Sequence, residues 1–359
     1  MTLPDQRPIL VTMGDAAGIG PEVIAKIWRD HAPDAAGCVV VGDVATMRRA
    51  AAIVAGPIAQ PVAEISSLDD FLTGHLPPNC MPVLQQCELL APLPAGLVSG
   101  LAAQAAADCI VWAARAVLSG QAKAIVTAPI NKEALSAAGG WAARFPGHTE
   151  MLQFEAARFL GKDVADVPVR MMLANDELKT VLVSIHLSLR HAIGAVTFDN
   201  VLQTLRITHA ALSIILGHAP HIAVAGLNPH AGEGGLFGAE EQTVIAPAIA
   251  AARLEGMHVS GPFAPDTVFM RARTKSSLLD NTIKPGEFDV VVAMYHDQGL
   301  IPVKYLGVEQ GVNVTLGLPL VRTSPDHGTA FDIAGTGKAD AASLLAAIRM
   351  ARQLTLSKR

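Results

Sequence analysis

"VTMGDAAGIGPEVI", residues 11–24, joins an apolar run to a helical pattern through Gly14, Gly18 and Gly20. A nucleotide-binding loop is the first hypothesis for such a turn. The glycines are spaced GxxxGxG, which differs from the GxGxxG fingerprint of Rossmann domains, and no Lys-Ser or Lys-Thr pair follows as in a P-loop. Asp43 follows the apolar run "CVVVG", but the glycine pattern that would make it a ribose ligand is absent. The stretch therefore excludes both familiar nucleotide loops.

Composition narrows the class of protein. The 359 residues allow two domains, and a chain that is 51% hydrophobic but only 4% aromatic favours tightly packed layers of small aliphatic side chains. A net charge of −5 without a basic block argues against nucleic-acid binding. The N-terminal residues lack a signal-peptide pattern, and apolar runs stop short of membrane-spanning length. The four cysteines show no CxxC pair or disulfide-like spacing, which favours reduced thiols and a soluble cytoplasmic protein.

Short apolar runs alternate with helical patterns along the chain. The predicted strands are ILVTM (9–13), CVVVGD (38–43), AIVTAP (124–129), VLVSIH (181–186), IAVAGLNPH (222–230) and DVVVAMYHD (289–297). The predicted helices include Pro21–Ile27, Gly100–Leu118, Thr149–Phe159 and Glu240–Leu254. Uniformly apolar strands separated by helices predict a largely parallel α/β sheet. The proline-rich stretch Leu76–Pro94 is predicted to run irregularly over the surface, and Arg271–Phe288 to be a surface insertion.

Three of the predicted strands end in a histidine: His186, His230 and His296. Because ligands bind outside the carboxyl ends of parallel strands, three imidazoles at that edge predict an open divalent-metal site. The alternative is that each histidine only caps backbone groups, since the chain has 12 histidines. Their shared placement and the polar neighbours Asn228 and Asp297 favour the metal site. Imidazoles suit zinc or a similar metal without selecting one.

Two further groups of polar residues fit an anionic ligand. In "FPGHTEML" (145–152), His148 and Thr149 stand at a predicted helix N-terminus, where free N–H groups receive an anion; an ordinary cap by Thr149 is the alternative. Lys304, Asn313 and Arg322 supply two cations and an amide in a segment that is otherwise apolar and rich in glycine. Together they suit a phosphate or a carboxylate, although each alone is typical of a solvated surface.

Longer motifs carry a family resemblance. "GDAAGIGPEV" resembles the N-terminal motif of the isocitrate/isopropylmalate dehydrogenase superfamily, and "DHGTAFDIAGTGKAD" resembles its cofactor loop. With "TAPINKEAL", "GLNPHAGEGG", "GPFAPDTVF" and "AMYHDQGLIPVK", the chain resembles the 4-hydroxythreonine-4-phosphate dehydrogenase (PdxA) family from about Ile9 to its C-terminal helix.

The resemblance implies a homodimer with a two-domain α/β/α isocitrate/isopropylmalate dehydrogenase-like fold, not a Rossmann fold. The expected first domain, on the cofactor side, comprises residues 1–127 with about 302–359. The expected second domain, about 128–301, carries the metal site and dimer contacts. The active site is expected in the interdomain cleft.

The implied activity is NAD-dependent oxidation of 4-phosphooxy-threonine followed by loss of CO2, which gives 3-amino-2-oxopropyl phosphate in pyridoxine (vitamin B6) biosynthesis. The implied metal is Zn, Mg or Co, held by His186, His230 and His296. The resemblance implies catalytic roles for Lys304 and Asp266. It further implies substrate contacts for His148, Thr149, Lys304, Asn313 and Arg322, and cofactor contacts for His327, Thr329, Ala330 and Asp332.

Several alternatives stay open from the sequence. Some motif variants match the branch of the family that acts on 4-phospho-D-threonate or 4-phospho-D-erythronate. The proton acceptor is Lys304, Asp266 or a water on the metal, and NAD is not distinguished from NADP. A metal hydrolase has no use for the cofactor loop. A phosphotransacetylase-like acyltransferase or a non-catalytic binder does not need the three histidines.

Overall fold

The computed structural model describes residues 5–56, 60–74, 76–89, 92–277, 282–307 and 310–356. The chain divides into two compact units, Met1–Pro168 with Leu318–Thr355, and Val169–Gly317 with Leu356–Arg359. The expected boundaries lay at 127/128 and 301/302. Residues 128–168 group with the first unit because helix α7 (His148–Leu160) packs on α5 (Gly100–Leu118), where Arg115 and Glu155 form an ion pair of 2.7 Å. The cofactor and metal roles expected for the two domains stay predictions.

The described strands of the first unit form a wholly parallel sheet. In spatial order they are β3 (Val62–Ile65), β4 (Met81–Gln85), β2 (Cys38–Gly42), β1 (Ile9–Thr12), β5 (Ala124–Thr127) and β14 (Val321–Pro325). The predicted strands at β1, β2 and β5 are confirmed. The prediction of an irregular surface path for Leu76–Pro94 was wrong, since Met81, Val83 and Leu84 are buried in β4. The prolines in and around this strand made its apolar residues resemble part of a loop.

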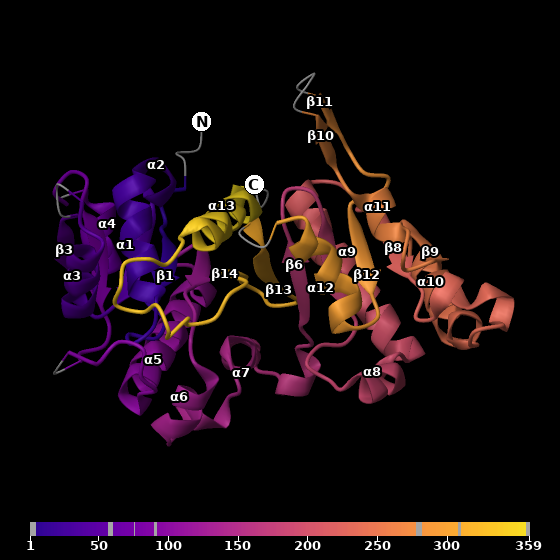
Figure 1. Cartoon of the computed structure of the whole chain (residues 1–359), viewed down its shortest axis with the longest axis horizontal. Helices are drawn as coiled ribbons and strands as arrows, with labels where there is room; N and C mark the ends of the chain where they lie inside the picture. The colour runs from indigo at the N-terminus through magenta and orange to yellow at the C-terminus, as the bar shows by residue number, and fades with distance from the viewer. Residues whose placement is uncertain are drawn as a thin grey trace. The chain divides into compact units, whose positions relative to one another are not determined.

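Helices cover both faces of this sheet. They are α1 (Gly20–Asp30), α2 (Ala32–Ala35), α3 (Val44–Ile53), α4 (Leu68–Leu72), α5, α6 (Lys132–Ala138), α7 and α13 (Ala342–Leu356), with the short turn η1 (Ala142–Arg144) and η2 (Val164–Asp166). Helix α5 packs on the face that carries Leu10 and Ile125. On the opposite face lies α13 (Figure 1, yellow), where Ala347 O accepts a hydrogen bond from Thr323 Oγ1 at 2.8 Å. Helix α5 is long and apolar enough to cross a membrane, but 61% of its most apolar 18-residue stretch is buried inside the protein, as in a core helix.

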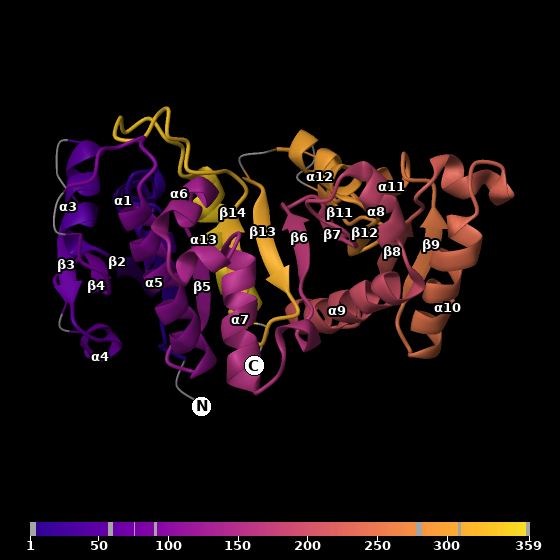
Figure 2. The ribbon, with the colours of Figure 1, turned by 90° about the horizontal axis from the view of Figure 1, so that it is seen from below.

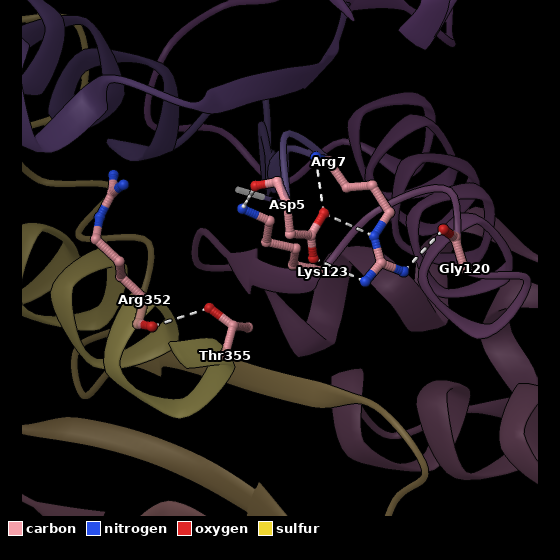
Figure 3. Close-up of polar contacts among 6 residues, drawn as sticks. All are labelled: Asp5, Arg7, Gly120, Lys123, Arg352 and Thr355. Carbon is pink, nitrogen blue, oxygen red and sulfur yellow. Dashed lines mark hydrogen bonds and ion pairs between the residues drawn. The ribbon is translucent and has the colours of Figure 1, made fainter. Parts of the chain in front are cut away.

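The segment before β1 is fixed to the turn between α5 and β5 (Figure 3). Arg7 Nε and Nη2 donate to the Asp5 carboxylate at 3.0 and 2.8 Å, and Arg7 Nη1 donates to Gly120 O at 3.0 Å. Lys123 Nζ donates to Asp5 O at 2.6 Å. These contacts set where the central strand β1 begins.

The second unit contains a mixed sheet. In spatial order its described strands are β13 (Val312–Leu316), β6 (Arg170–Ala174), β7 (Lys179–Leu182), β12 (Val290–Ala293), β8 (Ile222–Ala225) and β9 (Val259–Phe263). Strand β6 runs antiparallel to both neighbours, whereas β7, β12, β8 and β9 are parallel. The largely parallel sheet predicted from the sequence is therefore confirmed, with β6 as the exception.

The helices of the second unit are α8 (Leu189–Ala195), α9 (Phe198–Leu216), α10 (Ala246–Leu254), α11 (Val268–Ala272) and α12 (His296–Tyr305), with η3 (Pro229–Gly235) and a π-helical turn, η4 (Glu241–Ile245). Helices α9 and α10 pack against each other (Figure 2). Within Arg271–Phe288, β10 (Lys275–Ser277) and β11 (Thr282–Lys284) form a separate antiparallel pair, and residues 278–281 lie outside the described residues. Arg271 pairs with Glu287 at this insertion, with Nε to Oε2 at 2.8 Å.

Candidate functional site

The three histidines follow three neighbouring strands of the second unit. Strand β12 lies between β7 and β8, and both pairings are parallel. His186 lies four residues after β7, His296 begins α12 just after β12, and His230 lies in η3 after β8. The structure therefore places all three at the carboxyl edge of the same three strands, as predicted.

Two of these histidines line one pocket of about 230 Å³ together with Ser184, Tyr295 and Asp297. The ring centroids of His186 and His296 are 5.8 Å apart. His296 Nδ1 forms a hydrogen bond of 2.7 Å with Asp297 Oδ1, and Nε2 is then the ring nitrogen that can bind a metal or another ligand. Ser184 Oγ donates to Met294 O at 3.0 Å and so ties the two strand ends together.

A buried carboxylate organises the loop that carries His230. Glu241, only 3% exposed, accepts hydrogen bonds on Oε1 from Leu227 N and Asn228 N, both at 2.7 Å. The loop that follows is left-handed at successive residues, including His230 at φ 53°. Glu241 belongs to the π-helical turn η4, and such turns are frequent at functional sites. The sequence pattern gave no sign of this role, because Glu241 resembles any acidic residue near a helix start.

The metal site stays a prediction. Among the described residues, no three His, Cys, Asp or Glu side chains lie close enough together to hold a metal ion. His186 and His296 approach each other, whereas the ring of His230 lies against Phe237 with centroids 6.2 Å apart. The donor types and their common edge fit a divalent metal of the zinc class.

The other site residues predicted in the second unit lie on three separate elements. Asp266 is exposed in the turn before α11, and Lys304 is exposed in the last turn of α12. Asn313 is half-buried on β13, opposite Leu173 of β6. Their catalytic and substrate-binding roles stay predictions.

The first unit holds a buried cation at its sheet. Arg322 on β14 is 5% exposed, and its Nη2 donates to Thr127 Oγ1 on β5 at 2.8 Å. Burial lowers the pKa of Arg322 to about 10, against the favourable charge of Glu150. The guanidinium therefore stays protonated at neutral pH and keeps its charge in a desolvated position, which suits recognition of an anion.

His148 and Thr149 lie half-buried at the start of α7 in the same unit. His148 Nε2 is 3.2 Å from Ala128 O, and because a carbonyl only accepts, this nitrogen carries the proton. Burial, and secondly the charge of Arg322, hold the pKa of His148 well below its usual range. His148 is thus neutral at pH 7, and its Nδ1 is an acceptor. The predicted anion site combines this imidazole, the helix N-terminus and the Arg322 charge.

The opening glycine stretch and the predicted cofactor loop pack against each other. Ile19 N donates to Thr329 O at 3.1 Å, and a Cβ placed on Gly18 would lie 3.0 Å from Thr329 Cβ. Glu22, 2% exposed, accepts from Gly337 N at 2.6 Å. Gly18 therefore allows the close approach of this loop, whereas a Cβ on Gly14 or Gly20 would meet Pro129 O or Met13 O.

The predicted cofactor residues occupy different positions on that loop. Thr329 is 7% exposed, Ala330 has a left-handed backbone at φ 41°, and Asp332 is exposed. His327 Nδ1 is 3.0 Å from Gly328 O, and its buried Nε2 has no hydrogen-bond partner in the described part of the chain. Their cofactor role stays a prediction.

Asp15 is a polar residue that the sequence analysis missed. It follows β1, is fully buried, and its Oδ1 accepts from Ala17 N at 2.9 Å. Its Oδ2 has no hydrogen-bond partner in the part of the chain that the structure describes. Burial raises the pKa of this carboxyl, against the N–H groups of Ala17 and Asn131. Asp43, by contrast, caps α3 by accepting from Thr46 N at 2.7 Å, which agrees with the exclusion of a Rossmann ribose site.

The profile of the family described as pyridoxal phosphate biosynthetic protein PdxA matches residues 34–351. The chain belongs to the PdxA family. It is 50% identical to a 4-hydroxythreonine-4-phosphate dehydrogenase of Beijerinckia indica subsp. indica over 349 residues, 97% of this chain and 95% of that protein. It is 42% identical to a D-threonate 4-phosphate dehydrogenase of Salmonella typhimurium over 352 residues, 98% of this chain and 99% of the relative.

Structural similarity agrees with this membership. The crystal structure of 4-hydroxythreonine-4-phosphate dehydrogenase from Klebsiella pneumoniae matches with a TM-score of 0.82 at 40% identity, over 97% of this chain and 99% of that one. The predicted PdxA resemblance and its two-domain α/β fold class are thereby confirmed. The prediction of an oxidoreductase is confirmed at the level of the family.

Proposed function

We propose that this PdxA-family member catalyses the NAD-dependent, divalent-metal-dependent oxidation and decarboxylation of 4-phosphooxy-threonine to 3-amino-2-oxopropyl phosphate, as a cytoplasmic homodimer in pyridoxine biosynthesis. The observation that carries the proposal is the 50% identity, over 97% of the chain, to a relative named 4-hydroxythreonine-4-phosphate dehydrogenase. The buried Arg322 charge and the N-terminus of α7 supply the anion recognition that such a substrate needs.

In this proposal the first unit binds the anionic substrate. Arg322 presents a planar, permanently charged fork to the phosphate or carboxylate, and the first turn of α7 at His148 and Thr149 adds backbone N–H donors. The neutral His148 accepts a hydrogen bond on Nδ1 from a hydroxyl or an amino group of the substrate. Lys304 and Asn313, which belong to the second unit, are the other residues proposed to contact the substrate, as a cation and an amide.

His186, His230 and His296 would hold the divalent metal. When bound, such a cation polarises the hydroxyl at the carbon to be oxidised and lowers its pKa. Asp297 fixes the orientation of the His296 ring, and Glu241 fixes the turn that carries His230. Lys304 and Asp266 are the candidates on this chain for accepting the hydroxyl proton.

The proposed adenosine half of NAD lies on His327, Thr329, Ala330 and Asp332. The exposed Asp332 carboxylate suits ribose hydroxyls better than a 2′-phosphate, which favours NAD over NADP. Docking of this loop on Gly18 and Glu22 supports a fixed binding surface.

Formation of NADH by the purified enzyme tests the proposal. We expect turnover with 4-phosphooxy-threonine that a chelator abolishes and added Zn²⁺, Mg²⁺ or Co²⁺ restores. Binding of each metal to the apoprotein, measured by calorimetry, gives a readout that does not depend on turnover. If no NADH forms with 4-phosphooxy-threonine, 4-phospho-D-threonate or 4-phospho-D-erythronate, the proposed dehydrogenase activity is refuted.

A second substrate has specific support. The relative from Salmonella typhimurium is named D-threonate 4-phosphate dehydrogenase and is 42% identical over 98% of the chain. D-Threonate replaces the amino group of the first substrate with a hydroxyl, and a site built to bond one of these groups rejects the other strongly. Measuring kcat/KM for 4-phosphooxy-threonine, 4-phospho-D-threonate and 4-phospho-D-erythronate side by side decides between them.

A further inference from the structure

Two cysteines meet in the core of the first unit. Cys109 on α5 is fully buried, and Cys87, half-buried, follows β4. Cys109 Sγ donates a hydrogen bond to Cys87 Sγ over 3.5 Å, although the two residues are 22 apart in the sequence. Spacing alone gave no indication of this pair, because the contact depends on the unexpected strand β4.

We propose that Cys87 and Cys109 form a redox modification site, which closes to an intramolecular disulfide when the enzyme meets a low-molecular-weight disulfide such as oxidised glutathione. The sulfur atoms already touch, and a disulfide bond brings them only about 1.5 Å closer. Cys87 begins the segment that leads to α5, so small movements of this residue can supply that approach.

The order of the two thiol–disulfide exchange steps follows from the solvent exposure of the two cysteines. Cys87 is the half-buried thiol, so its thiolate attacks one sulfur of oxidised glutathione, which forms a mixed disulfide and releases one glutathione thiolate. Cys109 as thiolate then attacks the Cys87 sulfur, breaks the mixed disulfide and expels the second glutathione thiolate. The protons lost by the two cysteines pass to the two glutathione thiolates. Two protein thiols are oxidised and one small disulfide is reduced.

Cys109 is the second of the two thiols to react. Its pKa is raised well above the usual range, first by the hydrogen bond to the Cys87 thiol and then by burial. Modification of Cys87 removes that hydrogen bond, the larger cause, whereas burial continues to disfavour the Cys109 thiolate, so the second step is the slower one.

The disulfide would restrain a segment next to the predicted cofactor loop. Between Cys87 and α5, Gly96 N donates to Ala17 O at 2.8 Å. A Cβ on Gly96 would lie 2.5 Å from Phe331 O, so the backbone here touches the loop directly. Oxidation thus fixes the start of this segment, at Cys87, to the middle of α5.

The test treats the full-length enzyme with oxidised glutathione, then blocks remaining thiols with an alkylating agent under denaturing conditions. All four cysteines start as free thiols, and we expect two to be protected in a peptide pair that links Cys87 to Cys109 in mass spectrometry. We also expect the unfolding midpoint to rise by several degrees on oxidation and to return with dithiothreitol, because the bond constrains the unfolded chain.

Matched variants separate this site from general thiol chemistry. C87S and C109A should each abolish the protected pair and the shift in midpoint. Cys80 is half-buried like Cys87, and Cys38 is buried like Cys109 with its pKa raised to about 12 by burial, so C80S and C38A should leave both readouts unchanged. A mixed disulfide that persists at Cys87, a link through Cys38 or Cys80, or four thiols left free would each overturn the proposal.

Discussion

The two units hold their candidate ligand-binding residues in opposite ways. In the second unit, His186 and His230 are exposed and lie on left-handed backbone at φ 45° and 53°. In the first unit, Arg322 is 5% exposed and lies within a regular strand. In the second unit, a strained backbone sets the direction of exposed imidazole rings. In the first unit, burial in a low dielectric strengthens the electrostatic attraction between Arg322 and an anion. Substitution of the exposed histidines in the second unit should therefore affect ligand binding alone. Substitution of buried Arg322 in the first unit should affect both ligand binding and stability.

The largest effect is expected for His230→Ala. We expect loss of bound metal and a fall in turnover of more than about 100-fold, the upper range for loss of a residue that only supports a ligand. Since the His230 side chain is exposed, the free energy of unfolding of the apoprotein should change by less than about 0.5 kcal/mol. Metal content, NADH formation and denaturant unfolding measure these quantities. His218→Ala, also at an exposed histidine, is the control, and normal turnover of His230→Ala would remove this residue from the metal site.

Arg322→Lys should reduce kcat/KM for the phosphorylated substrate by about 10- to 100-fold. Lysine keeps the charge but loses the planar fork that reaches Thr127 and the anion, at a cost of about 1.5–3 kcal/mol. Arg170→Lys is the control, because Arg170 is a strand arginine that is partly buried and donates a hydrogen bond to Thr204 in the second unit. Equal losses in the two variants would show that the effect is structural.

The neutral state of His148 predicts a pH dependence of stability. Its folded pKa lies below the usual 6.5, so the unfolded chain binds the proton first as the pH falls. Stability should decrease below about pH 6.5, by at most about 1.4 kcal/mol per pH unit from this group. Urea unfolding across pH 5–8 measures the slope, and His148→Gln should flatten it. An unchanged slope in that variant would assign the pH dependence to other groups.

Asp15→Asn should raise the stability of the fold. The raised pKa means that burial disfavours the charged form of Asp15 in the folded state, and the resulting loss of stability grows as the pH rises from the unfolded pKa of about 3.9 through the folded pKa. The amide keeps an acceptor for Ala17 N without the charge, so a gain of about 1 kcal/mol is expected at pH 7. Denaturant unfolding at pH 7 measures this change in the free energy of unfolding. A loss of stability instead would mean that the charge has a partner in the folded enzyme.

The smallest effect is expected for Asp5→Asn. The hydrogen bond from Arg7 lowers the pKa of Asp5 to about 2, so its contribution is complete above the unfolded value of about 3.9 and is lost as the pH falls toward 2. Both side chains are partly exposed, and the loss at pH 7 should be about 0.2–1 kcal/mol. Urea unfolding of Asp5→Asn and of Arg322→Lys at pH 7 compares the stability contributed by an exposed arginine contact with that contributed by a buried one. Enzyme activity should not change.

Local sequence pattern predicted the regular parts of both units well. The strands ending near Thr12, Thr127 and Ala293 have the uniformly apolar composition of buried parallel strands. Strand β4 was missed because the prolines around Met81–Gln85 resemble a loop, whereas its pairing with Val40 and Val41 is a long-range contact.

The site residues were chosen where residue type alone carries the chemistry, and their roles stay predictions. Strand-end histidines and the cations of the C-terminal region are visible in the sequence. The roles of Asp15, Glu241 and the Cys87–Cys109 pair depend on burial and on contacts between distant segments. No local pattern distinguishes such a carboxylate from a surface one.

The first unit is completed by a segment that is synthesised late. Its residues up to Pro168 emerge early from the ribosome, but Leu318–Thr355 follow only after Val169–Gly317 of the second unit. Until β14 arrives, the edge of β5 has no partner on that side, and Arg322 has not reached Thr127. Unpaired strand edges favour aggregation, so the nascent chain carries this hazard for the time needed to synthesise about 150 residues. Chains that end prematurely in the second unit should therefore be insoluble as well as inactive.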